Sequence, residues 1–200
     1  MGESKLNSEY LIAILAGGKS RRMGEDKAAL VWRGQTLLER IAREAQKVSA
    51  CVCVIGRNPS HGWPLEKIPF LPDAVADAGP LGGLLAALQF AQHRSFKGVL
   101  ATACDMPLLD SEDLRWLLQQ SQFCKTHGSA VQNQTQIEPL FSLYKTETLP
   151  LVESQLNQNR KSLHGLIERG DFQIIKAPDL VCAKLLNVNR PEDWKLLQGP

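Results

Sequence analysis

The order of apolar and polar positions divides the chain into two alternating patterns. Short runs that are apolar at nearly every position are typical of strands buried on both faces of a parallel sheet. Apolar residues spaced three and four apart are typical of a helix that packs one face on such a sheet. The short runs predict strands at 10–15, 51–55, 68–71, 98–104, 129–132, 140–144, 172–176 and 184–188. The helical spacing predicts helices at 36–48, 80–93, 111–120, 147–155 and 163–169, and a last helix from 191.

Residues at the ends of the predicted helices suit those positions. Thr36 and Ser111 are side chains that commonly cap helix N-termini, and Pro191 suits a first helical turn. Because strands and helices alternate, we predict a single α/β domain over residues 1–200, with three layers in the order α/β/α. Its sheet is expected to be mostly parallel and to become mixed in the second half, where two strands follow one another directly.

Composition and charge exclude several classes of protein. Apolar residues make up 44% of the chain and charged residues 22%, which argues against disorder. The formal charge of +2, from 23 basic and 21 acidic residues, is too small for a dedicated nucleic-acid-binding surface. No apolar run is long enough to span a membrane, and the polar first residues are unlike a signal peptide. We therefore expect a cytoplasmic protein with reduced cysteines and with neither nucleic-acid nor membrane partners.

The loop after the first predicted strand concentrates glycines and positive charge. Residues 15–27 read LAGGKSRRMGEDK, and their four basic residues exceed their two acidic ones by the same two charges as the whole chain. Glycines let backbone N–H groups approach a ligand closely, and α/β proteins bind phosphates at the carboxyl ends of strands. The spacing fits neither the P-loop nor the dinucleotide-binding fingerprint. The loop is therefore typical either of another kind of phosphate-binding loop or of a solvated basic loop.

Four further residues are candidate ligand groups at strand ends. Asp105 follows an apolar run, where a carboxylate can cap a helix or bind Mg²⁺, which prefers hard oxygen ligands. Asp73 can be a turn residue, or it can accept hydrogen bonds from the N1–H and 2-amino groups of guanine. Asn187 and Asn189 share one face of the predicted strand 184–188, although asparagines that end a strand are often turn residues.

Together these motifs resemble a known family. LAGGKSRRMGEDK is similar to the signature of nucleotidyltransferases of the nucleotide-diphospho-sugar transferase type, and most similar to its form in molybdenum cofactor guanylyltransferases. Further matching motifs follow in the family's order: PD at 72–73, GPLGG at 79–83, CDMP at 104–107, EPLF at 138–141 and NVNRPED at 187–193. Gly17 after Ala16 favours guanine over cytosine transfer. The chain departs from the family pattern at Glu138, where Gln or His is expected.

The resemblance implies a reaction in which GTP and molybdopterin-bound molybdenum give the guanine dinucleotide cofactor and pyrophosphate, with Mg²⁺ as cofactor. It implies a nucleotide-binding half at about 10–128 and an acceptor-binding half at about 129–200. The nucleotide is expected to bind at Leu15, Ala16, Gly17, Gly18, Lys27, Asp73 and Asp105. The acceptor is expected to bind at Asn187 and Asn189. The expected catalytic residues are Lys27, Asp105, Arg21 and Arg22, of which Asp105 is also the metal ligand.

Two alternatives remain open. A sister nucleotidyltransferase would use CTP or another phosphorylated acceptor. A non-catalytic carrier would bind nucleotide or cofactor and deliver it to molybdoenzymes or other cofactor-biosynthesis proteins, which are open as partners in either case. Lys27 and Asp105 favour an enzyme, because a cation and a metal-binding carboxylate are the groups that phosphate transfer needs.

Overall fold

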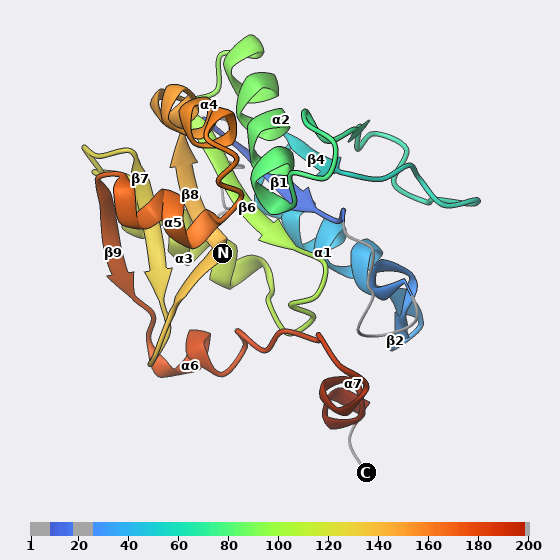
Figure 1. Ribbon diagram of the computed structural model, residues 1–200. Helices are drawn as coiled ribbons and strands as arrows, with labels where there is room; N and C mark the ends of the chain where they lie inside the picture. Colours follow the sequence, from blue (N-terminus) through green and yellow to red (C-terminus); the bar gives the residue numbers. More distant parts are fainter. Residues whose placement is uncertain (1–8, 18–25, 199–200) are drawn as a thin grey trace.

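The structure, a computed structural model, describes residues 9–17 and 26–198. Within them, the central sheet has the strand order β5-β4-β1-β6-β8-β7-β9 (Figure 1). β1 pairs in parallel with β4 and β6, whereas β8 is antiparallel to both β6 and β7. The prediction of a mostly parallel sheet that becomes mixed in its second half is therefore confirmed. The strands are β1 (Tyr10–Leu15), β4 (Val52–Ile55), β5 (Phe70–Leu71), β6 (Gly98–Ala103), β7 (Gly128–Gln132), β8 (Ile137–Lys145) and β9 (Phe172–Lys176).

Helices cover both faces of the sheet and complete the three predicted layers (Figure 1). α1 and α3 pack on one face, and α2, α4 and α5 pack on the other. Short 3-10 helices lie at Lys27–Ala29 (η1) and Thr146–Thr148 (η2). No helix in the described part of the chain is both long and apolar enough to span a membrane. The helices are α1 (Leu37–Gln46), α2 (Pro80–His93), α3 (Ser111–Ser121), α4 (Leu149–Asn157), α5 (Leu163–Arg169), α6 (Asp179–Cys182) and α7 (Pro191–Gln198).

The middle of the sheet is buried on both faces. Ile12 and Ile14 of β1 lie in the core beneath α1 and α3, whereas Leu11 and Ala13 lie in the core beneath α2. Parallel neighbours have their carboxyl ends on the same side of the sheet, and Leu15 of β1 is paired with Ala103 of β6. The residues that follow these two strands therefore emerge side by side.

The predicted strand at 184–188 is wrong. The last ladder bond runs from the Ala177 N–H to the Gln132 carbonyl, and Pro178, which has no N–H, then precedes the short helix α6. The chain leaves the sheet edge there and crosses to the loop after β6 as irregular backbone. Leu185 and Val188 are buried singly against the core, so their apolar character reflects packing and not strand pairing.

Two local features differ from the prediction or were missed by it. The N-cap of α3 is Asp110 and not Ser111: its carboxylate accepts from the backbone of Asp113, whose own carboxylate accepts from the Asp110 N–H. A short hairpin, β2 (Val31–Trp32) with β3 (Gln35–Thr36), also precedes α1. Its turn residues Arg33 and Gly34 both have positive φ, as a tight hairpin turn requires, but Arg-Gly is a weak sequence signal for it.

Candidate active site at the carboxyl ends of the parallel strands

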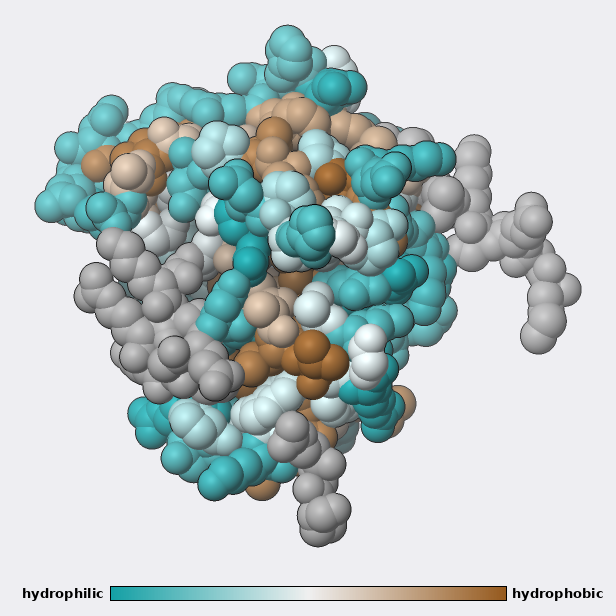
Figure 2. Space-filling view, turned by 90° about the vertical axis from the view of Figure 1, so that its right-hand side faces the viewer, coloured by the Kyte–Doolittle hydropathy of each residue, from teal (hydrophilic) through white to brown (hydrophobic). Residues whose placement is uncertain are grey.

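Two adjoining cavities lie where β1, β4, β5 and β6 end. The Asp73 cavity, about 180 Å³, is lined by Asp73, Gly17 and Gly83 among others, and the Glu138 cavity, about 410 Å³, is lined by Asp105, Glu138, Asn187 and Asn189 among others. Pro80 and Leu140 line both, so the cavities share a wall. Seen from the side toward which β1 and β6 point, the surface is largely hydrophilic, with hydrophobic residues exposed in its middle (Figure 2).

The Asp73 cavity depends on a close approach of three loops. A Cβ on Gly56 would lie only 2.8 Å from the Gly17 Cα and 3.0 Å from Asp73 Oδ1, and a Cβ on Gly83 would lie 3.2 Å from the same oxygen. Burial raises the pKa of Asp73, and no described residue donates a hydrogen bond to its carboxylate. The carboxylate is therefore held at the cavity wall with its acceptor positions open to a ligand.

Lys27 and Asp105 lie together beside the Glu138 cavity. Lys27 Nζ is 3.6 Å from Asp105 Oδ2 and donates to Asn189 Oδ1. Both ionic side chains are largely buried, with exposed fractions of 16% and 19%. Burial raises the pKa of Asp105, and the Lys27 ammonium only partly opposes this. Asp105 Oδ1 is buried and has no hydrogen-bond partner among the described residues.

The position of Lys27 is fixed by the residue before it. Asp26 caps η1 by accepting from the Ala28 N–H at 3.1 Å. The Arg57 guanidinium, which follows β4, donates to both Asp26 oxygens, at 3.2 and 2.8 Å. The Arg57–Asp26 pair therefore ties the start of η1 to the neighbouring strand end.

The C-terminal segment, residues 183–190, brings Asn187 and Asn189 to the Glu138 cavity. The Val188 N–H donates to the backbone carbonyl of Asp105 at 2.8 Å. The N–H groups of Asn189 and Arg190 donate to Asp193 Oδ2 at the start of α7. Although strand 184–188 is absent, both predicted asparagines line the cavity, and Asn189 contacts Lys27 directly.

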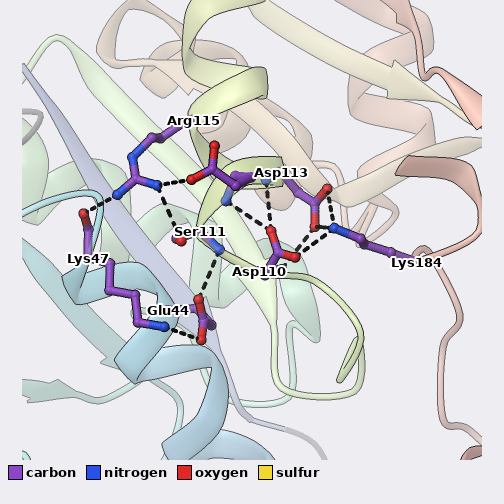
Figure 3. Close-up of polar contacts among 8 residues, drawn as sticks. Glu44, Lys47, Asp110, Ser111, Asp113, Arg115 and Lys184 are labelled. Atoms are coloured by element: carbon purple, nitrogen blue, oxygen red, sulfur yellow. Dashed lines mark hydrogen bonds and ion pairs between the residues drawn. The ribbon is translucent and has the colours of Figure 1, made fainter. Parts of the chain in front are cut away.

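The same segment is attached to α3 by the Lys184 clasp, the ion pairs of Lys184 with Asp110 and Asp113 (Figure 3). Lys184 Nζ lies 2.6 Å from Asp110 Oδ2 and 3.1 Å from each Asp113 oxygen. Burial alone would raise the pKa of Asp110, but hydrogen bonds from Lys184 and from the helix backbone lower it. Burial dominates at Asp113 and raises its pKa. The clasp thus joins the segment to the helix that follows the Asp105 loop.

Other predicted residues are distributed as follows. Leu15 and Gly17 line the Asp73 cavity, whereas the Ala16 N–H donates to the Ile55 carbonyl at 3.0 Å and so extends the sheet ladder. Gly18, Arg21 and Arg22 lie outside the described residues, so their roles remain predictions. A third cavity, about 520 Å³, lies at the amino ends of β1 and β6, by Tyr10 and Lys97, and no predicted site residue lines it.

Several cavity residues were not predicted as site residues. Lys161 and His164 line the Glu138 cavity from the start of α5, and Lys161 Nζ donates to the Asp77 carbonyl at 3.1 Å. Gln136 and Glu138 line it from the loop before β8 and from β8 itself. The only sequence signal for any of them was the match at 138–141, in which Glu138 departs from the expected residue.

Comparison with known proteins identifies the family. The profile of the MobA-like NTP transferase domain matches residues 12–173. The chain belongs to this family. A probable molybdenum cofactor guanylyltransferase of Opitutus terrae is 32% identical over 186 residues, which cover 90% of this chain and 91% of that protein. Another, of Pelotomaculum thermopropionicum, is 35% identical over 186 residues, with coverage of 90% and 87%.

A solved structure has the same fold. Molybdopterin-guanine dinucleotide biosynthesis protein A from Archaeoglobus fulgidus superposes with a TM-score of 0.78 at 22% identity, covering 94% of this chain and 96% of that one. The resemblance inferred from the loop at 15–27 and the later motifs is therefore confirmed at the level of the MobA-like family.

We predict that Gly56→Ala destabilises this MobA-like domain more than Gly34→Ala. Both glycines have positive φ, +86° and +80°, so both substitutions cost about 1–2 kcal/mol of backbone strain. Only at Gly56 does the new methyl group also meet the Gly17 backbone, which adds about 1–3 kcal/mol. Urea denaturation of the two variants measures the difference. Equal losses would show that the loops after β1 and β4 do not approach as closely as described.

We predict that Lys184→Met lowers the free energy of unfolding by about 1–3 kcal/mol, because the Asp113 side chain, 5% exposed, loses its cation. The control Lys47→Met breaks an ion pair whose lysine is 57% exposed, and it should cost no more than about 0.5 kcal/mol. The pKa of Lys184 is raised by its carboxylate partners, so its contribution persists at neutral pH and disappears as pH rises through that pKa. Similar costs for both variants at neutral pH would contradict the clasp.

Proposed function

We propose that this protein transfers the guanylyl group of GTP to the terminal phosphate of molybdopterin-bound molybdenum cofactor, releasing pyrophosphate. The observation that carries the proposal is the pair of adjoining cavities, with Lys27 and Asp105 together beside the larger of the two. A transferase needs two ligand sites that meet at the reacting phosphorus, whereas a carrier needs only one. The guanylyltransferase names of relatives at 32–35% identity support the choice of GTP and of the acceptor.

The Asp73 cavity is the proposed site of the guanine base. A carboxylate can accept hydrogen bonds from both the N1–H and the 2-amino group of guanine, an edge that cytosine and adenine lack. Asp73 has no donor among the described residues, so base binding would satisfy it without breaking a protein contact.

Lys27 is the proposed electrostatic partner of the reaction. Attack by the acceptor phosphate on the α-phosphorus moves negative charge onto the departing pyrophosphate, and a positioned cation stabilises that charge. Asn189, Asp105 and the η1 cap hold Lys27 in place before the substrates bind. Positioning of this kind lowers the reorganisation needed in the transition state.

The residues present fit a magnesium ion. Asp105 Oδ1 is a buried, unpartnered hard oxygen, and no group of three or more metal-binding side chains exists among the described residues. Mg²⁺ commonly uses one or two carboxylates together with substrate phosphates, so Asp105 and the triphosphate would hold it. Once bound, it would neutralise phosphate charge during transfer.

A transfer assay tests the proposal. Purified protein, Mg²⁺, GTP labelled at the α-phosphate and molybdopterin loaded with molybdate should yield labelled guanine dinucleotide cofactor and an equal amount of pyrophosphate. Product from CTP in preference to GTP would favour the sister nucleotidyltransferase. Binding of GTP without any product would favour the carrier. Cytoplasmic location and contact with molybdoenzymes or other cofactor-biosynthesis proteins remain predictions.

We predict that Asp73→Ala weakens GTP binding by about 10- to 100-fold, the loss expected for hydrogen bonds to a charged group. Inosine triphosphate, which lacks the 2-amino group, should bind the parent more weakly than GTP but bind the variant about as well as GTP does. Isothermal titration with both nucleotides measures the two ratios. An unchanged preference for GTP in Asp73→Ala would make Asp73 a turn residue only.

We predict that Asp105→Asn reduces Mg²⁺-dependent transfer by about 100-fold or more and raises the Tm of the ligand-free protein near neutral pH. Burial raises the pKa of Asp105, so its ionised form destabilises the fold above the ordinary Asp range, and the amide removes that cost. The Tm difference should vanish in acid, where the carboxyl group is neutral. The exposed control Asp171→Asn should change neither property. A variant with parental activity, or with a lower Tm at neutral pH, would contradict the assignment.

A further inference from the structure

Glu138 is a buried carboxylate at the wall of the Glu138 cavity. It is the second residue of β8, where it pairs with Val131 of β7, and it is only 4% exposed. Buried carboxylates are normally paired with a cation, because an isolated charge is costly in an apolar interior. No ion pair of Glu138 is found among the described residues.

The hydrogen-bond partners of Glu138 are neutral amides. Asn133 Nδ2 and Gln136 Nε2 donate to Oε1 at 2.6 and 3.0 Å. Burial raises the pKa of Glu138, and the side chains of Gln136 and Asn187 partly lower it again. An ionised carboxylate has about four acceptor positions, and these two donors both use Oε1, so Oε2 keeps acceptor positions for a ligand.

The loop before β8 is organised to hold this arrangement. Asn133 Oδ1 accepts from the N–H groups of Thr135 and Gln136, at 2.9 and 3.0 Å, which directs its amide nitrogen toward Glu138. The turn therefore fixes two donors on one carboxylate oxygen. No cation among the described residues forms an ion pair with Glu138, although His164 acts to lower the pKa of the carboxyl group and the Asp105 carboxylate acts to raise it.

This charge determines which part of the proposed acceptor can lie against Glu138. The phosphate, the dithiolene sulfurs and the oxo groups of molybdenum cofactor are anionic or acceptors, so a carboxylate repels them. The N–H donors of molybdenum cofactor are all on its pterin, at N3, at the 2-amino group and on the reduced ring. The pterin is thus the only part of the acceptor that offers Glu138 hydrogen bonds.

We propose that Glu138 is a specificity-determining residue that accepts a hydrogen bond from the N–H edge of the pterin and so orients the acceptor. With the pterin at Glu138, the terminal phosphate would be free to reach Asp105, which lines the same cavity, and Lys27 beside it. This inference rests on the proposed function for the identity of the acceptor. The role of Glu138 is nevertheless a binding property that can be measured without transfer.

A matched pair of ligands tests the inference. 6-Hydroxymethylpterin carries the 2-amino group, whereas 6-hydroxymethyllumazine has a carbonyl oxygen there, which Glu138 would repel. Fluorescence titration should show that the parent binds the pterin at least about 10-fold more tightly than the lumazine, whereas Glu138→Gln binds the two within about threefold. The KM for loaded molybdopterin should rise about 10-fold in Glu138→Gln, with the Kd for GTP unchanged.

A variant in the loop before β8 distinguishes pterin recognition by Glu138 from a purely structural role of this residue. Asn133→Ala removes one contact of the loop before β8 but keeps the carboxylate, so it should lower the Tm and keep the parent's preference for pterin. An equal pterin-to-lumazine ratio in the parent and Glu138→Gln, or no measurable binding of either compound to the parent, would overturn the inference. A parent that discriminates between the compounds but makes no dinucleotide would instead overturn the proposed function and leave Glu138 as a pterin-binding residue.

Discussion

The parallel pairing of β1 with β6 is the constraint on which the rest of the site depends. Both strands are buried on both faces, and Leu15 is in register with Ala103, so their following loops start at the same edge. The β1 loop leads to Lys27, and the β6 loop begins with Cys104 and Asp105. A shift of one residue would exchange the side chains of β1 between the core beneath α1 and α3 and the core beneath α2, and both would have to repack. The packing of the core thereby fixes the relative positions of the two ionic groups.

The site keeps three carboxylates in surroundings that disfavour their ionised forms. Burial is the largest cause of the raised pKa at each of Asp73, Asp105 and Glu138. None of the three has a cation to itself in the described part of the structure. Within that part, Asp73 accepts no hydrogen bond, Glu138 accepts hydrogen bonds only from amides, and the Lys27 near Asp105 also donates to Asn189. Ligands that bring N–H groups or a metal ion relieve these costs, so binding and stability are coupled in this domain. The hydrophobic cores on the two faces of the sheet stabilise the fold enough to offset the cost of these carboxylates.

The sequence predicts best those features that are decided locally. α2 begins at Pro80 and ends at His93 as predicted, because a proline suits the first turn and the apolar spacing is helical throughout. β1 is also as predicted, because an apolar run from Tyr10 stops at the glycine pair of residues 17 and 18. Asp105 and Lys27 could be singled out because each lies in a motif beside a strand end.

What the sequence could not predict depends on contacts between distant segments. Leu185 and Val188 are buried and look like a strand, but the chain has already left the sheet at Pro178 and they pair with no strand of the described sheets. The pairing of Lys184 with Asp110 and Asp113 joins residues more than 70 positions apart. Glu138 could be noted from the sequence only as a departure from the family pattern, because its burial and its neutral partners depend on the loop before β8.

The irregular form of the C-terminal segment has a functional consequence. In a strand, the N–H groups of residues 187–190 would bond to a neighbouring strand. Here Val188 donates to the Asp105 carbonyl, while Asn189 and Arg190 donate to Asp193. These three N–H groups are therefore bound by the loop after β6 and by α7 and not by the sheet. Because Lys184 also holds this segment to the helix after that loop, the segment is attached to the surroundings of Asp105 at two points, and Asn189 connects it to Lys27.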